Sequence, residues 1–159
     1  MAHRVRDEGG PALAAQALLY PPIDPDAETA SRDRYRYGPI LSTAALEQMW
    51  TQYLQNPAAK ESPLAVPSKA ASMRGLPPAL VVTVEVDPLR DEAEAYGSQL
   101  AAAGVPTKVV SIPGLIHGSL NMSAYLPRSR EIMQAVVEFL RANLVVPNQS
   151  AAVESATAN

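Results

Sequence analysis

An aspartate and a histidine are the residues of this 159-residue sequence whose type and position most strongly suggest acid–base chemistry. Asp87 directly follows an apolar, β-branched run, Leu80–Val86. His117 lies in a loop after a second such run, Thr107–Ile112. If the two runs are neighbouring parallel strands, their carboxyl ends meet at the sheet edge where ligands bind. There a carboxylate can hold an imidazole in one tautomer while the imidazole takes a proton from a nucleophile.

Each of the two residues also has an ordinary structural explanation. Asp87-Pro88 at the end of a strand is a common start of a helix, with the aspartate as N-cap and proline at the first helical position. A single histidine in a loop is more often an ordinary polar residue than a catalytic base. Local spacing alone therefore leaves open whether Asp87 and His117 form a site.

Three apolar runs and three amphipathic stretches supply the elements that would position this pair. The predicted strands are Ala14–Tyr20, Leu80–Val86 and Thr107–Ile112, and the predicted helices cover about 43–54, 89–103 and 129–143. The first run is continuously apolar, which is typical of a strand buried on both faces. The strand–helix–strand–helix order predicts an α/β fold with a mostly parallel sheet, the strands adjacent in chain order and Thr107–Ile112 at the edge.

One domain is expected over residues 1–146, with an irregular insert at about 24–78 and a disordered tail at 147–159. The predicted helix of the insert carries four apolar side chains on one face, namely Leu46, Met49, Trp50 and Tyr53. This face either holds the insert on the core, the interpretation that we favour, or lines a channel for a lipid-like substrate.

The composition excludes several classes of function. The chain has 13 basic and 16 acidic residues, and this mild balance argues against a nucleic-acid or anionic-membrane surface. We therefore expect Arg32, Arg34 and Arg36 in a solvated loop. Without cysteine and with only two histidines, neither a metal site nor a thiol nucleophile is expected, and no cofactor is implied. No apolar run reaches 18 residues and no leader pattern is visible, so a cytoplasmic protein is expected.

Several segments together resemble one known family. They are ALLYP at Ala17–Pro21, SPL at Ser62–Leu64, LPPALVVTVEVDPLRDEAEAY at Leu76–Tyr96, AGVP at Ala103–Pro106 and GLIHG at Gly114–Gly118. This series resembles the C-terminal half of the hormone-sensitive-lipase family, the bacterial family IV of α/β-hydrolase esterases. The most specific feature is DPLRDE followed thirty positions later by HG.

The resemblance implies a serine esterase that acts on small acyl esters. It implies Asp87 as the acid and His117 as the base of a Ser-Asp-His triad. It does not favour Asp91 or Glu92, whose expected role is to stabilise the first turn of the following helix.

The resemblance implies that residues 1–146 are a partial α/β-hydrolase domain and that the insert at about 24–78 is cap-like. It also suggests a substrate pocket and an assembly. Leu89, Ile116 and Ser119 are expected near the substrate. Ser119 stands where the family usually has phenylalanine, a departure that changes the wall of the pocket. A homodimer through the Thr107–Ile112 edge strand is expected by analogy with the family.

The nucleophile of such a triad is missing from the sequence. The serine of α/β-hydrolases lies in G-x-S-x-G, but the glycines spaced four apart are Gly114 and Gly118, with Ile116 between them. An HGG-type oxyanion motif is also absent. We therefore expect this chain to correspond to the C-terminal half of an esterase, with an unpaired strand edge and negligible activity by itself.

Three functions stay open at this point. The chain is the acid- and base-bearing part of an esterase, a non-catalytic binding protein on the same fold, or an inactive gene fragment. Plant gibberellin receptors resemble the family but lack its catalytic histidine, so His117 favours an enzyme. The absent serine motif favours the third possibility.

Overall fold

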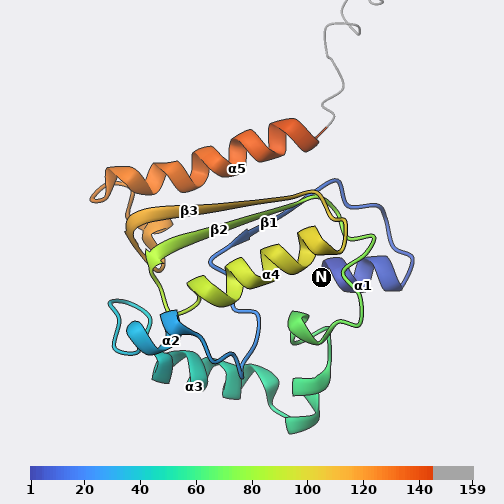
Figure 1. The fold of residues 1–159 in the computed structure, drawn as a ribbon, viewed down its shortest axis with the longest axis horizontal. Coiled ribbons are helices and arrows are strands. Elements are labelled where there is room, and N and C mark those ends of the chain that lie inside the picture. Colours follow the sequence, from blue (N-terminus) through green and yellow to red (C-terminus); the bar gives the residue numbers. More distant parts are fainter. Residues whose placement is uncertain (145–159) are drawn as a thin grey trace, which may run out of the picture.

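A three-stranded parallel sheet organises the chain in the computed structural model, which describes residues 1–144 (Figure 1). Its strands are β1 (Gln16–Leu19), β2 (Ala79–Val86) and β3 (Thr107–Ile116), and they lie side by side in that order. Both pairs of neighbours are parallel. The predicted fold class, strand order and strand direction are therefore confirmed. The tail predicted at 147–159 lies outside the described residues.

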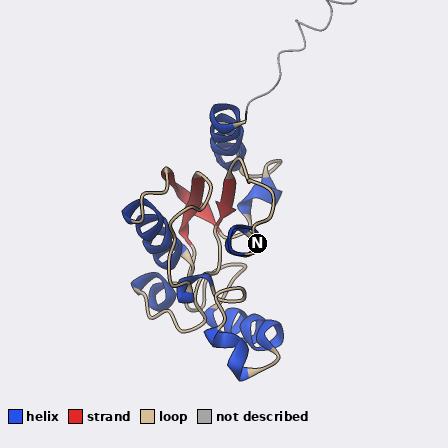
Figure 2. Ribbon diagram, turned by 90° about the vertical axis from the view of Figure 1, so that its right-hand side faces the viewer, coloured by secondary structure: helices blue, strands red, loops and turns tan. Residues whose placement is uncertain are grey.

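Five α-helices are present in the described part of the chain. They are α1 (Ala2–Asp7), α2 (Ala30–Arg34), α3 (Thr43–Leu54), α4 (Arg90–Ala102) and α5 (Arg130–Asn143). Helices α4 and α5 cover opposite faces of the sheet, and the view turned by 90° shows the strands between helices (Figures 1 and 2). Short 3₁₀ turns occupy Pro57–Glu61, Pro67–Lys69, Ser119–Met122 and Pro127–Ser129.

Strand β2 is buried on both faces because alternate side chains contact different helices. Leu80, Val82 and Val84 share one core cluster with Ile132 and other residues of α5. On the opposite face, the hydroxyl of Thr83 donates a hydrogen bond of 2.8 Å to Glu94 of α4. The two-residue period of the strand thus joins both helical layers to one central element.

Strand β1 differs from its prediction. It is shorter than Ala14–Tyr20, and its side chains are half-buried or exposed, so burial on both faces is wrong for this strand. The physical reason is its position: within residues 1–144, β1 pairs with β2 on one side and with no strand on the other. The run Ala14–Tyr20 is therefore more apolar than the half-buried or exposed position of β1 requires.

Residues 24–78, called the insert below, pack against the rest of the chain (called the sheet domain below) through one side of α3. Leu46 and Trp50 are buried with Leu89 in an apolar cluster. Met49 and Tyr53, from the same predicted apolar face, are 55% and 62% exposed. These two exposed side chains help to line an apolar groove of about 400 Å³. The face therefore holds the insert on the core with only half of its predicted residues.

None of the helices within residues 1–144 is both long and apolar enough to cross a membrane.

Two neighbouring residues of α5 offer a test of the core. Ile132 is fully buried, whereas Met133 is 47% exposed. We expect Ile132→Ala to lower the free energy of unfolding by about 2–5 kcal/mol, because it removes buried methyl groups and leaves a cavity. The matched control Met133→Ala should change it by less than about 0.5 kcal/mol. Urea unfolding followed by circular dichroism measures both values, and equal losses would contradict this packing.

Candidate active site

Asp87 and His117 meet at the carboxyl edge of the sheet, at the ends of β2 and β3. Nδ1 of His117 lies 2.8 Å from Oδ2 of Asp87. The side chain of Asp87 is fully buried, and that of His117 is 22% exposed. An ionised carboxylate only accepts hydrogen bonds, so Nδ1 carries the hydrogen and donates it. In the neutral imidazole this leaves Nε2 as the basic nitrogen.

The second carboxylate oxygen of Asp87 fixes the turn that follows the strand. Oδ1 accepts a hydrogen bond of 2.9 Å from the backbone N–H of Leu89. The backbone carbonyl of Asp87 accepts another, of 3.2 Å, from the N–H of Arg90. The helix-cap explanation offered by the sequence is wrong in its detail, because α4 begins at Arg90, its N-cap is Leu89, and no side chain caps it. The Asp87 carboxylate instead holds the turn before the helix and contacts the histidine.

A bulge in β3 brings the two side chains to the same level. The pairing of β2 with β3 runs regularly to Val84 and Ile112, and it resumes at Val86 and Ile116. One residue separates these pairs on β2 and three separate them on β3. The predicted end of this strand at Ile112 is therefore wrong, because the bulge absorbs two residues and pairing continues. The next residues on the two strands are Asp87 and His117.

The bulge is held by a glycine and a glutamate. Gly114 has a φ of +75°, a conformation that other residues adopt with strain. Its N–H donates a hydrogen bond of 2.7 Å to the carboxylate of Glu85. The carbonyl of Glu85 in turn accepts a hydrogen bond of 3.3 Å from the guanidinium of Arg90. These contacts connect the loop that carries the histidine to β2.

Tyr20 is a residue of this site that the sequence analysis missed. It directly follows β1, and its ring lies against the imidazole of His117, with centroids 4.8 Å apart and an angle of 58° between the planes. Its φ of 37° is unusual for a bulky residue and is a strained conformation. Burial raises the pKa of the Tyr20 hydroxyl, and the charge of Asp87 acts in the same direction. The signal was available, because Tyr20 also lies at the carboxyl end of a predicted strand.

The predicted pocket residues lie in different surroundings. Leu89 is 2% exposed and packs against the insert. Ser119 is fully buried, and Ile116 is half-buried at the end of β3. The contact of these three residues with a substrate stays a prediction.

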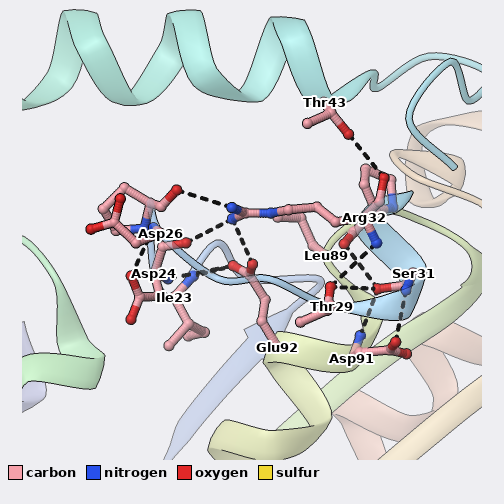
Figure 3. Close-up of polar contacts among 12 residues, drawn as sticks. Ile23, Asp24, Asp26, Thr29, Ser31, Arg32, Thr43, Leu89, Asp91 and Glu92 are labelled. Atoms are coloured by element: carbon pink, nitrogen blue, oxygen red, sulfur yellow. Dashed lines mark hydrogen bonds and ion pairs between the residues drawn. The ribbon is translucent and has the colours of Figure 1, made fainter. Parts of the chain in front are cut away.

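Asp91 and Glu92 have partners beyond their own helix (Figure 3). Asp91 accepts a hydrogen bond from the insert, and Glu92 forms an ion pair of 2.7 Å with Arg32. Their expected role as simple stabilisers of the helix end is therefore incomplete. Burial raises the pKa of Glu92, although the N–H of Ile23 and the guanidinium of Arg32 oppose this shift.

The solvated position expected for Arg32 is wrong. Arg32 is only 8% exposed, because Glu92 and the carbonyls of Asp24 and Pro25 surround its guanidinium. Arg34 and Arg36 lie instead beside exposed or half-buried tyrosine rings, at 5.7 Å from the ring centroids.

An acid–histidine pair at the carboxyl edge of a parallel sheet matches the placement of two members of the triad in α/β-hydrolases. Comparison with known proteins agrees: the model of the α/β-hydrolase fold family matches residues 1–121, and the chain belongs to this family. The resemblance to the esterases of the hormone-sensitive-lipase family is also supported, because several relatives are named as esterases.

Individual relatives show how much of the family is present. The chain is 36% identical to the carboxylic ester hydrolase LipN of Mycobacterium tuberculosis, over 89% of this chain and 38% of that protein. It is 33% identical to the ethyl acetate hydrolase of Pseudomonas putida, over 81% and 41%. A solved thermostable esterase from Pseudomonas putida superposes with a TM-score of 0.81 at 39% identity, over 92% and 47%. The chain thus spans less than half the length of these proteins.

Two glycines with positive φ allow the backbone strain of a substitution to be distinguished from its effect on the position of His117. We expect Gly114→Ala and Gly104→Ala each to lower the free energy of unfolding by about 1–2 kcal/mol, because φ is +75° at Gly114 and +83° at Gly104. Only Gly114→Ala should weaken the hydrogen bond between His117 and Asp87. Urea unfolding measures the first effect, and exchange of the His117 Nδ1 proton in NMR spectra measures the second. Equal proton exchange in the two variants would contradict the role of the bulge.

Proposed function

We propose that this chain is the acid- and base-bearing part of a carboxylesterase. Asp87 and His117 act as acid and base of a Ser-Asp-His triad whose serine lies outside these 159 residues. The observation that carries the proposal is the 2.8 Å contact between Nδ1 of His117 and the buried Asp87 carboxylate at adjacent strand ends. The names of the relatives add support, because they include ester hydrolases.

The geometry suits transfer of an acyl group. Nε2 of His117 removes the proton of the serine hydroxyl while the serine oxygen bonds to the ester carbonyl carbon. The adjacent Asp87 carboxylate stabilises the imidazolium that forms. The imidazolium then returns the proton to the departing alkoxide, which leaves as the alcohol. In the second half, the same nitrogen takes a proton from water, whose oxygen bonds to the acyl carbon. The imidazolium then gives that proton to the serine oxygen as its bond to the acyl carbon breaks, which releases the acid and restores the serine.

We further propose that the insert contributes the second part of a cap over a small acyl-ester substrate, with Leu89, Ile116 and Ser119 near the substrate. The packing of Leu89 against Leu46 and Trp50 supports a direct link between insert and site. The oxyanion donors of this fold belong to sequence motifs that the chain lacks, so they are assigned to the same external segment as the serine.

A homodimer of the complete protein through the Thr107–Ile112 edge is also proposed. Strand β3 pairs with β2 alone in the described part of the chain, which leaves backbone groups of β3 available for a second copy. Analytical ultracentrifugation of this chain fused to a nucleophile-bearing N-terminal half tests this assembly. A monomer at all concentrations would contradict it.

Complementation with a nucleophile-bearing half tests the function. In this test, the N-terminal half of the Pseudomonas putida ethyl acetate hydrolase would be fused to this chain, and the fusion protein would be assayed for hydrolysis of a short-chain aryl ester. His117→Ala should abolish turnover, and Asp87→Asn should lower it by about 10⁴-fold because the imidazole adopts the wrong tautomer. The matched control Asp91→Asn should cost far less.

Two results would contradict the proposal. One is a folded fusion protein without hydrolysis, as expected for a non-catalytic binding protein. The other is an Asp91→Asn variant that loses as much turnover as Asp87→Asn, because Asp87 would then not be the distinct acid of the triad. Circular dichroism and size-exclusion chromatography establish that each protein is folded before its activity is compared.

A further inference from the structure

We propose that Ser31 of the insert is a positioning residue for Asp87, and that the insert orients the Asp87–His117 pair through its hydroxyl group. The positioning of Asp87 stands on the contacts described below. Its consequence for catalysis rests on the function proposed above.

Ser31 joins the insert to the turn that follows β2 and to the first turn of α4 by three hydrogen bonds, and Figure 3 shows its contacts with Asp91. It is fully buried. Its Oγ donates to the backbone carbonyl of Pro88 at 3.0 Å and accepts from the backbone N–H of Asp91 at 3.2 Å. Its own N–H donates to the Asp91 carboxylate at 2.8 Å. One small side chain thus satisfies a carbonyl before α4 and an N–H in the first turn of that helix.

The peptide unit between Pro88 and Leu89 transmits this contact to the acid. Its carbonyl oxygen is bound by Ser31, and its N–H donates to Oδ1 of Asp87 at 2.9 Å. A peptide unit is planar, so its C=O and N–H turn together as one rigid plane. Rotation of this plane away from Ser31 would also move the donor that holds the Asp87 carboxylate. The other oxygen of that carboxylate binds Nδ1 of His117.

Arg32 makes the position of Ser31 rigid. Its guanidinium lies 2.7 Å from Glu92 and donates to the carbonyls of Asp24 and Pro25 at 2.7 and 2.9 Å. Its carbonyl accepts a hydrogen bond of 3.0 Å from the hydroxyl of Thr43, at the start of α3. The buried ion pair anchors α2 on α4 directly beside the serine, so the hydroxyl has little freedom to follow a moving peptide.

A purely structural role for Ser31 predicts a different result. If the hydroxyl only attached the insert to α4, its removal would lower stability and leave the hydrogen bond between Asp87 and His117 intact. If Ser31 positions Asp87, removal must weaken that hydrogen bond in molecules that remain folded.

NMR of the 159-residue chain separates the two roles. The probe is the His117 Nδ1 proton, whose exchange with water slows while it is bound to Asp87. Ser31→Ala should raise its exchange rate about tenfold, the worth of one buried hydrogen bond. The matched control is Ser129→Ala: Ser129 is also fully buried, and its Oγ has no hydrogen-bond partner within residues 1–144. The control should leave the exchange rate unchanged.

A second pair of variants keeps the test decisive if Ser31→Ala unfolds. The side chain of Asp91 is 27% exposed, so its truncation is easier to tolerate than that of a buried serine. Asp91→Ala removes the acceptor of the Ser31 N–H and should increase exchange of the His117 proton by a smaller factor than tenfold. Asp91→Asn keeps an acceptor oxygen and should restore slow exchange. Identical rates in wild type, Asp91→Ala and any folded Ser31→Ala would overturn the proposal.

Activity of the complemented enzyme supplies an independent measurement. Ser31→Ala should lower kcat about tenfold with little change in KM, because it disturbs the base and not the binding of the ester. A rise in KM alone would overturn the positioning of the pair in catalysis. If the wild-type fusion is inactive but Ser31→Ala still accelerates proton exchange, the proposed function fails and the positioning of Asp87 stands.

Discussion

The burial of β2 on both faces is the constraint on which the rest of the structure depends. Its side chains alternate between the layer of α5 and the layer of α4, so a single strand connects both halves of the core. The strand ends at Asp87, a carboxylate with no exposed surface. Burial of such a group costs free energy unless it is hydrogen-bonded. The Leu89 N–H and the imidazole of His117 provide those bonds, so the requirement of the core and the geometry of the site coincide.

The position of the histidine depends on an irregularity, because regular pairing of β3 would place a different residue beside Asp87. The bulge after Ile112 shifts the register, and the contact of Gly114 with Glu85 holds the shifted backbone. Tyr20 then packs against the imidazole from the end of β1. Each strand therefore contributes one side chain to the same edge. This arrangement follows from the parallel direction of the strands, because all of their carboxyl ends lie together.

The insert is attached to the sheet domain by polar contacts as well as by an apolar cluster. Arg32 and Glu92 form a buried ion pair, which contributes little net stability compared with an apolar contact of similar volume. Such a pair does specify one geometry, because either charge left without its partner would be costly. The contacts of Ser31 lie directly beside it. Buried charge here thus serves the placement of a segment more than the strength of its attachment.

The sequence by itself determined the strands and their parallel order, because apolar periodicity and strand-end position are local properties. Those properties left the pairing of Asp87 with His117 open, and only the resemblance to a known family implied it. The sequence did not reveal the bulge in β3, the exposure of β1 or the burial of Arg32. Those features depend on which backbone and side-chain partners the fold brings within reach from distant parts of the chain. The local sequence around Glu92 indicates only a charge at the start of a helix. Its partner, the guanidinium of Arg32, is 60 residues away in the sequence and comes beside it only in the tertiary structure. Local patterns fix the elements, whereas the satisfaction of buried polar groups is decided by the assembled whole.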